Sequence, residues 1–114
     1  MAALKTRIYD VGPVRALEIS GSITMGEGDL TVRHLIKGIL AEGHTKIVVD
    51  LSNVPSMDST GLGELVSAYT SAKHGGAVLK LAGLTRKVKD ILTITRLTSV
   101  FESYDTVDEA AKSF

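Results

Sequence analysis

One short run, Lys46-Ile47-Val48-Val49-Asp50-Leu51, constrains the fold of this chain more than any other segment. Its apolar residues are largely β-branched and occupy consecutive positions, a pattern typical of a strand that helices cover on both faces. Apolar residues recur at helical spacing before this run, up to Gly43, and after it, from Leu62 to Tyr69. We therefore predict a central strand that lies between two helices in the sequence.

Strand and helix patterns alternate along the rest of the chain. Strands are predicted at 7–11 and 16–19, as a hairpin around Gly12-Pro13, at 77–82, and briefly near Phe101. Helix starts are predicted at Asp29 and Thr85, with a short helix over 106–112. Such alternation favours parallel strands joined by crossover helices. We expect an α/β fold, one domain over residues 1–114, with a mixed four- to five-stranded sheet and about four helices packed against it.

Composition excludes several classes of function. The formal net charge of +0 gives no field that would attract nucleic acid or a lipid surface. Without cysteine there is no disulfide framework and no thiolate metal site, which is compatible with the cytoplasm as the default location. The apolar runs are strand-sized, so we expect no integral membrane association.

The segment from Met57 to Leu62 is the most informative for function. It follows the central strand, and loops at the carboxyl ends of parallel strands are favoured binding sites. Asp58, Ser59 and Thr60 are each preferred helix N-caps, and capping by one of them is the simplest explanation. A phosphoryl group there would add roughly 1.5 to 2 negative charges beside the positive helix end, which tolerates anions, while disrupting a docked partner. These arguments do not choose between Ser59 and Thr60.

Two glycines, Gly61 and Gly63, follow the hydroxyl residues. We expect them to leave the hydroxyl exposed and to let another backbone approach closely, with plain steric relief as the simpler alternative. The glycine-rich segment 21–28 has neither P-loop nor dinucleotide spacing and is predicted to be a loop. A cluster formed by Arg86, Lys87 and Lys89 is interpreted as a solvated helix face rather than a docking site.

Catalysis by Ser59 is not expected, so the chain is predicted not to be an enzyme. A hydrolase nucleophile turn places glycine two residues before the serine, where this chain has Met57, and it needs a histidine base. The histidines His34, His44 and His74 fall near helix ends and loops and have no metal-ligand spacing. We therefore predict neither a metal site nor a cofactor.

The string Asp50-Leu51-Ser52-Asn53-Val54-Pro55-Ser56-Met57-Asp58-Ser59-Thr60-Gly61-Leu62-Gly63 resembles the signature of the bacterial anti-sigma factor antagonists, which are built on the STAS domain. The resemblance extends over nearly the whole chain, including the Gly75-Gly76 break before the strand at 78–81 and the helix from Thr85. It implies a partner switch. The unmodified protein binds an anti-sigma factor that is a serine kinase, which frees a sigma factor, and phosphorylation of the antagonist ends binding until a phosphatase resets it.

The resemblance marks Ser59 as the phosphoacceptor, and ATP belongs to the kinase. It implies partner contacts through Asp58, Ser59, Thr60, Gly61 and Leu62. Thr24 is a further contact position, where many members carry an acid. Thr24 is thus one departure from the family pattern, and a second is Thr95-Arg96-Leu97, which stands where many members have a Thr-Gly-Leu turn. Three alternatives stay open: a STAS scaffold or accessory subunit of a stress-signalling or transport complex in which Ser59 is never modified, a nucleotide or lipid sensor, and a weak homodimer.

Overall fold

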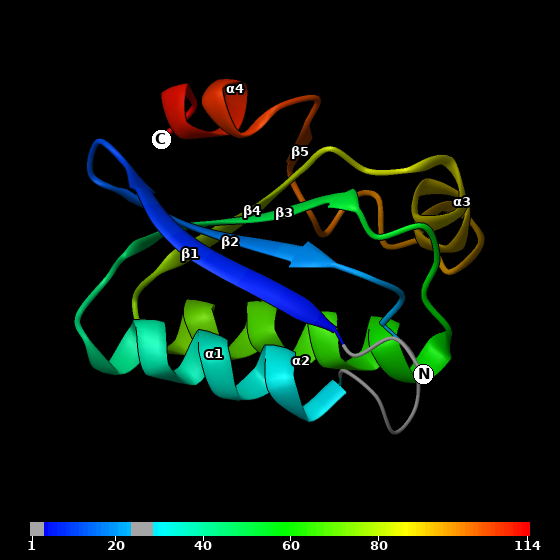
Figure 1. The fold of residues 1–114 in the computed structure, drawn as a ribbon, viewed down its shortest axis with the longest axis horizontal. Helices are drawn as coiled ribbons and strands as arrows, with labels where there is room; N and C mark the ends of the chain where they lie inside the picture. The colour runs from blue at the N-terminus through cyan, green and yellow to red at the C-terminus, as the bar shows by residue number, and fades with distance from the viewer. Residues whose placement is uncertain (1–3, 24–28) are drawn as a thin grey trace.

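The computed structural model of the chain describes residues 4–23 and 29–114, and within them it has one five-stranded sheet and four helices (Figure 1). The strands lie side by side in chain order, and their bounds are β1 Lys5–Val11, β2 Val14–Ser20, β3 Lys46–Asn53, β4 Val78–Ala82 and β5 Ser103–Tyr104. The helices are α1 Asp29–Ala41, α2 Ser59–His74, α3 Arg86–Ile94 and α4 Val107–Lys112. The predicted fold class is confirmed.

The sheet is mixed, as expected. β1 and β2 pair antiparallel through a tight turn at Gly12, whose φ of 58° only glycine adopts without strain. The pairs β2–β3, β3–β4 and β4–β5 are parallel, and each connection crosses over through a helix. Because strand order follows chain order, the carboxyl ends of β3 and β4 lie next to each other.

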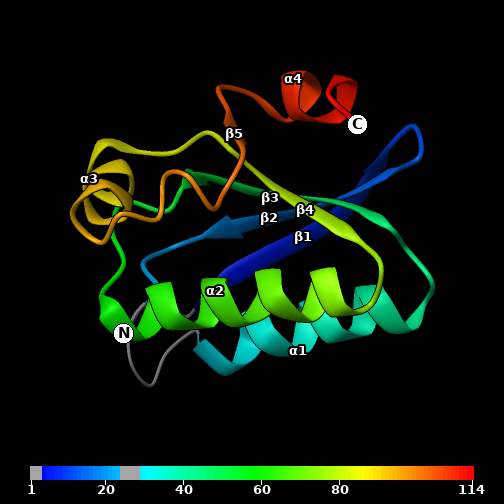
Figure 2. The same ribbon diagram turned by 180° about the vertical axis from the view of Figure 1, so that it is seen from behind.

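β3 is buried on both faces, which explains its unbroken apolar run. Ile47, Val49 and Leu51 belong to the main core, where α1 and α2 cover the sheet. Val48 points to the opposite face and packs in a smaller cluster with Val14, Ala82 and Ala110 of α4. Figures 1 and 2 show this arrangement from two sides, with α1 and α2 together under one face and α4 over the other.

The last strand begins slightly later than the sequence suggests. Phe101 is buried in the main core and packs edge-to-face on Tyr69 of α2, at 5.1 Å between ring centroids. β5 itself comprises only Ser103 and Tyr104, which pair with Leu81 and Ala82. This pairing leaves the first half of β4 without a strand beside it on that edge.

Lys80 is a buried charge that the sequence pattern did not reveal. It lies in β4, on the face covered by α4, and its side chain is 8% exposed. Its ammonium donates to the Ser113 carbonyl oxygen at 3.1 Å and to the Ser113 hydroxyl at 2.8 Å, and it pairs with Glu102 at 3.0 Å. The rings of Tyr104 and Phe114 lie against the same cation. Lys80 thus fastens the segment that contains α4 to the sheet.

Candidate functional site

The turn from Met57 to Leu62 connects β3 to α2 at the carboxyl end of the sheet. β3 ends at Asn53, and α2 begins at Ser59 after five intervening residues. The connection is fixed to the neighbouring crossover by the Thr85 hydroxyl, which donates to the Val54 carbonyl at 2.7 Å. Thr85 precedes α3 as predicted, but its hydroxyl does not cap that helix because it is used in this contact. This bond fixes the beginning of the β3–α2 connection next to the residue that precedes α3.

Asp58 is the N-cap of α2, which confirms the simplest interpretation of this residue. Its backbone is extended, at φ −95° and ψ −175°, and its side chain accepts a hydrogen bond from the Gly61 N–H at 2.9 Å. Its carbonyl accepts from the Leu62 N–H at 2.9 Å, which is the first intrahelical bond. The amides of Ser59 and Thr60 precede that bond and so have no acceptor within the helix. The positive end of the helix at these amides favours a nearby anion.

The exposed fraction of the side chain differs between Ser59 and Thr60, the two hydroxyl residues that the local sequence arguments did not distinguish. Ser59 is exposed at the first position of α2, whereas Thr60 is half-buried. Of the two side chains, that of Ser59 is therefore the more accessible to solvent.

The turn is held in place by the chain around Ile23. Ile23 forms an isolated parallel bridge with Met57. Its N–H donates to the Ser56 carbonyl at 3.2 Å, and its carbonyl accepts from the Asp58 N–H at 3.3 Å. The hydroxyls of Ser22 and Ser56 are 2.9 Å apart. These contacts place Ser22 and Ile23, which follow β2, directly against the start of α2.

Gly61 is required by this contact and Gly63 is not. A β-carbon on Gly61 would collide with the carbonyl group of Ile23, whereas one on Gly63 would have nothing within 4 Å. Within the described chain, a close backbone approach is found at Gly61 and not at Gly63. The remaining predicted contact residues differ in placement: Leu62 is buried, at 6% exposed, and Thr24 lies outside the described residues.

Sequence reasoning missed an ion pair one turn further along α2. Glu64 is 9% exposed between α1 and α2, and it receives a two-pronged contact from Arg33 of α1, with Nε to Oε2 at 2.8 Å. A signal was available, because Glu64 is a charged residue between the apolar positions Leu62 and Leu65. Its partner lies on another helix and leaves no local pattern.

The other candidates take simple positions. Arg86, Lys87 and Lys89 are exposed on α3, consistent with a solvated face. No group of three or more His, Asp or Glu side chains suited to a metal ion occurs in the part of the chain that the structure describes. Within the same residues, no helix is both long and apolar enough to cross a membrane.

Arg96 occupies the glycine position of the family's Thr-Gly-Leu turn, and its backbone adopts the conformation that glycine favours. Its φ is 61°, the one positive value outside glycine among the described residues. Its N–H donates to Thr93 and that of Leu97 donates to Leu92, the two bonds of a Schellman motif that ends α3. The backbone at Arg96 therefore has the conformation that favours glycine, the residue that the resemblance leads us to expect at this position.

The family model for the STAS domain matches residues 5–110 of this chain. The chain belongs to the STAS domain family. An anti-sigma-B factor antagonist of Bacillus subtilis is 32% identical over 97 residues, which cover 85% of this chain and 82% of that protein. A Thermotoga maritima protein, named as a candidate anti-sigma factor antagonist, is 37% identical over 71 residues, and there the match spans 62% of this chain and 63% of the length of the relative.

Solved structures agree with this assignment. The crystal structure of a candidate anti-sigma factor antagonist from T. maritima matches with a TM-score of 0.86 at 28% identity, covering 95% of this chain and 92% of the other. The Bacillus protein SpoIIAA in its phosphorylated form matches with a TM-score of 0.73 over 96% of this chain and 98% of the other. At 14% identity, the SpoIIAA match supports the STAS fold alone.

Proposed function

We propose that this STAS domain, acting as one unit over residues 1–114, is a cytoplasmic anti-sigma factor antagonist that is switched by phosphorylation of Ser59. In the unmodified state it binds an anti-sigma factor that is also a serine kinase, and a sigma factor is thereby released. The observation that carries the proposal is the exposed Ser59 hydroxyl at the start of α2, directly after the Asp58 cap. The names of the similar proteins supply the partner class.

The proposed switch acts at the surface and leaves the fold intact. A phosphate on Ser59 would lie beside the amides of Ser59 and Thr60, which have no helical acceptor, so the helix end stabilises the added charge. A docked partner would have to desolvate this phosphate beside the Asp58 carboxylate, where like charges accumulate. Binding is therefore lost while the domain stays folded.

The neighbouring residues have distinct parts in this scheme. Asp58 orients the serine by capping the helix, and Thr60 and the backbone at Gly61 form the contact turn. Leu62 supports the turn from the core, because its side chain is buried. Thr24, the residue after Ile23 in the sequence, is a further partner contact in this proposal. The kinase supplies ATP and a phosphatase reverses the modification, so the antagonist needs no cofactor and carries out no catalytic step.

The proposal is tested by affinity capture from the native host, with the wild-type chain and the Ser59→Asp variant as baits, followed by incubation of the captured kinase with ATP. We expect the wild type to retain an anti-sigma factor and to gain a single phosphate by intact-mass analysis. Ser59→Ala should abolish the modification, whereas Thr60→Ala, the matched control on the next residue, should still be modified. Ser59→Asp should retain the partner poorly.

Two results would overturn this function. A phosphate that remains on Ser59→Ala would place the modification elsewhere. Full capture by Ser59→Asp of subunits of a transport or stress-signalling complex, without a kinase, would instead support a scaffold whose serine is not a switch.

A further inference from the structure

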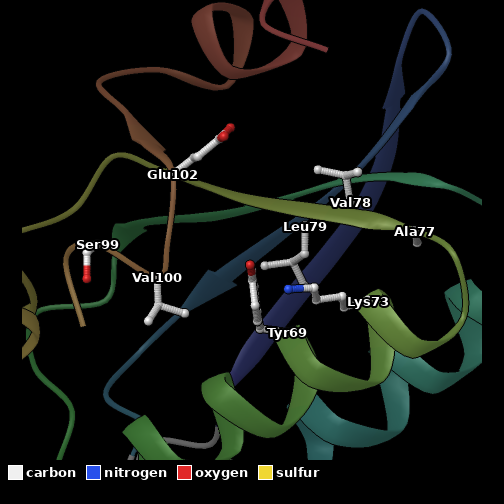
Figure 3. A pocket seen from close by; sticks show the side chains of 8 residues that line it. All are labelled: Tyr69, Lys73, Ala77, Val78, Leu79, Ser99, Val100 and Glu102. Carbon is white, nitrogen blue, oxygen red and sulfur yellow. The ribbon is translucent and has the colours of Figure 1, made fainter.

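A pocket lies at the opposite end of α2 from Ser59, beside the half of β4 that β5 does not reach. Its volume is about 330 Å³, within the range of small-molecule sites. The lining comes from α2, β4 and the segment before β5: Tyr69, Lys73, Ala77, Val78, Leu79, Ser99, Val100 and Glu102. Figure 3 shows these side chains around the open edge of β4.

The floor of the pocket is apolar and partly open to solvent. Leu79 and Ala77 are buried at its base, whereas Val78 is 50% exposed and Val100 is 38% exposed. These are two of the few large apolar side chains that the described surface leaves exposed. Val78 points to the opposite face of β4 from Leu79 (Figure 3). An apolar body placed against Leu79 and Val100 would remove Val100 from water, which is favourable at roughly 25 cal/mol per Å² of buried area.

Three hydrogen-bond donors of this pocket have no partner in the described chain. They are the Lys73 ammonium and the hydroxyls of Tyr69 and Ser99. In Figure 3 the Lys73 ammonium and the Tyr69 hydroxyl are both directed toward the Leu79 side chain, on the side of β4 that faces α2. The Leu79 N–H faces the same edge of β4, because N–H groups two residues apart along a strand point the same way and those of Leu81 and Gly83 donate to Glu102 and Tyr104.

The one carboxylate in the lining does not compete for these donors. Glu102 is paired with Lys80 at 3.0 Å, and Figure 3 shows its carboxylate directed away from Lys73. The pocket therefore presents one unneutralised cation and neutral donors above an apolar floor. A carboxylate can accept several such bonds, and charge-assisted bonds of this kind are about twice as strong as neutral ones.

We propose that this pocket binds a small organic monocarboxylate, with its carboxylate on Lys73 and Tyr69 and its compact apolar body against Leu79 and Val100. The site is separate from the Ser59 turn and does not depend on the proposed switch. It gives this STAS domain a place to bind a metabolite of that class.

The test is an amide NMR titration of the full chain with benzoate as the probe. We expect saturable shifts at residues of the pocket, with a dissociation constant on the order of 1 mM, as suits so small a ligand. Benzamide, which keeps the body without the charge, and acetate, which keeps the charge without the body, should each bind at least tenfold more weakly than benzoate.

Variants assign the contacts. Lys73→Gln should weaken benzoate binding about tenfold, and Tyr69→Phe, which keeps the ring packed on Phe101, should weaken it about threefold. Lys37→Gln, a matched exposed lysine on α1, should leave binding unchanged. The proposal is overturned if benzoate causes no saturable shifts at the pocket, if benzamide binds as tightly as benzoate, or if Lys73→Gln and Lys37→Gln behave alike. Urea unfolding of each variant verifies that it is folded.

Discussion

The carbonyl group of Ile23 occupies the space where a β-carbon on Gly61 would have to lie. Gly61→Ala should therefore force the start of α2 away from the Ile23 segment and lower the free energy of unfolding by about 1–3 kcal/mol, the usual cost of overpacking. Urea unfolding followed by circular dichroism measures this change.

Gly63→Ala is the matched control, two residues further along the same helix. Its β-carbon would meet nothing within 4 Å, and alanine is a better helix former than glycine, so stability should rise by roughly 0.5–1 kcal/mol. The structure requires that Gly61→Ala lowers the free energy of unfolding and that Gly63→Ala raises it. Equal effects would contradict the contact between Gly61 and the Ile23 carbonyl group.

Replacement of Arg33 should lower the free energy of unfolding by more than its partly exposed side chain suggests. In Arg33→Met the Glu64 carboxylate would stay buried between α1 and α2 without its partner, and we expect a loss of about 1–2 kcal/mol. This is less than for a fully enclosed pair because the Arg33 side chain is 42% exposed. The comparison is Arg7→Met, whose ion pair with Glu18 lies on the surface and should contribute less than about 1 kcal/mol. Thermal and urea unfolding would detect the difference, and similar losses would argue against a buried carboxylate.

Substitution of Arg96 by glycine should stabilise the protein. The left-handed backbone at this residue costs a non-glycine side chain roughly 1–2 kcal/mol, part of which is offset by the greater freedom of glycine in the unfolded chain. We expect Arg96→Gly to raise the free energy of unfolding by about 0.5–1 kcal/mol, and Arg96→Ala, which keeps the strain, to change it little.

The opposite substitution, from glycine to a residue with a side chain, can be made at the end of α2. Gly76 holds the equivalent position of a second Schellman motif, with a φ of 78° and open space around it. Gly76→Ala should therefore lower stability by about 1 kcal/mol. A stabilising effect of this alanine would show that backbone conformation is not the cause.

Tyr9 should give the protein a pH dependence in the alkaline range. Its partial burial, followed by the nearby charge of Asp50, raises the pKa of its hydroxyl above 10.0. Because the unfolded chain loses this proton first, the contribution of Tyr9 to stability is complete below about pH 10 and is lost as the pH rises through the folded pKa. The decrease in unfolding midpoint above about pH 10 should be smaller in Tyr9→Phe than in the wild type. The difference in tyrosinate absorbance between the two proteins would locate the folded pKa.

Most of the fold could be predicted because its signals are local. The unbroken apolar run of β3 indicated burial on both faces, and the cap at Asp58 and the hairpin at Gly12 follow from preferences of single residues. The position of β5 was less well defined, because Phe101 is apolar for packing against Tyr69 rather than for pairing in the sheet.

The details of the site could not be read from the sequence in the same way. The need for glycine at residue 61 comes from Ile23, and the burial of Glu64 comes from Arg33, so each depends on a partner far away in the chain. The same holds for Lys80, whose charge is satisfied by Ser113 and Glu102. Pattern reasoning finds which face of an element is buried, but it does not find which distant group compensates a buried charge.

The small cluster of Val14, Val48, Ala82 and Ala110 also has a consequence for synthesis on the ribosome. Val14 is translated early, whereas Ala110 is the last of the four residues to be translated. The face of the sheet to which Val14 belongs is therefore covered only after α4 has been synthesised. The face under α1 and α2 draws most of its residues from earlier in the chain and can assemble sooner. Until α4 arrives, the nascent chain would expose an uncovered apolar face of the sheet, which is the stage at which we expect a chaperone to bind it.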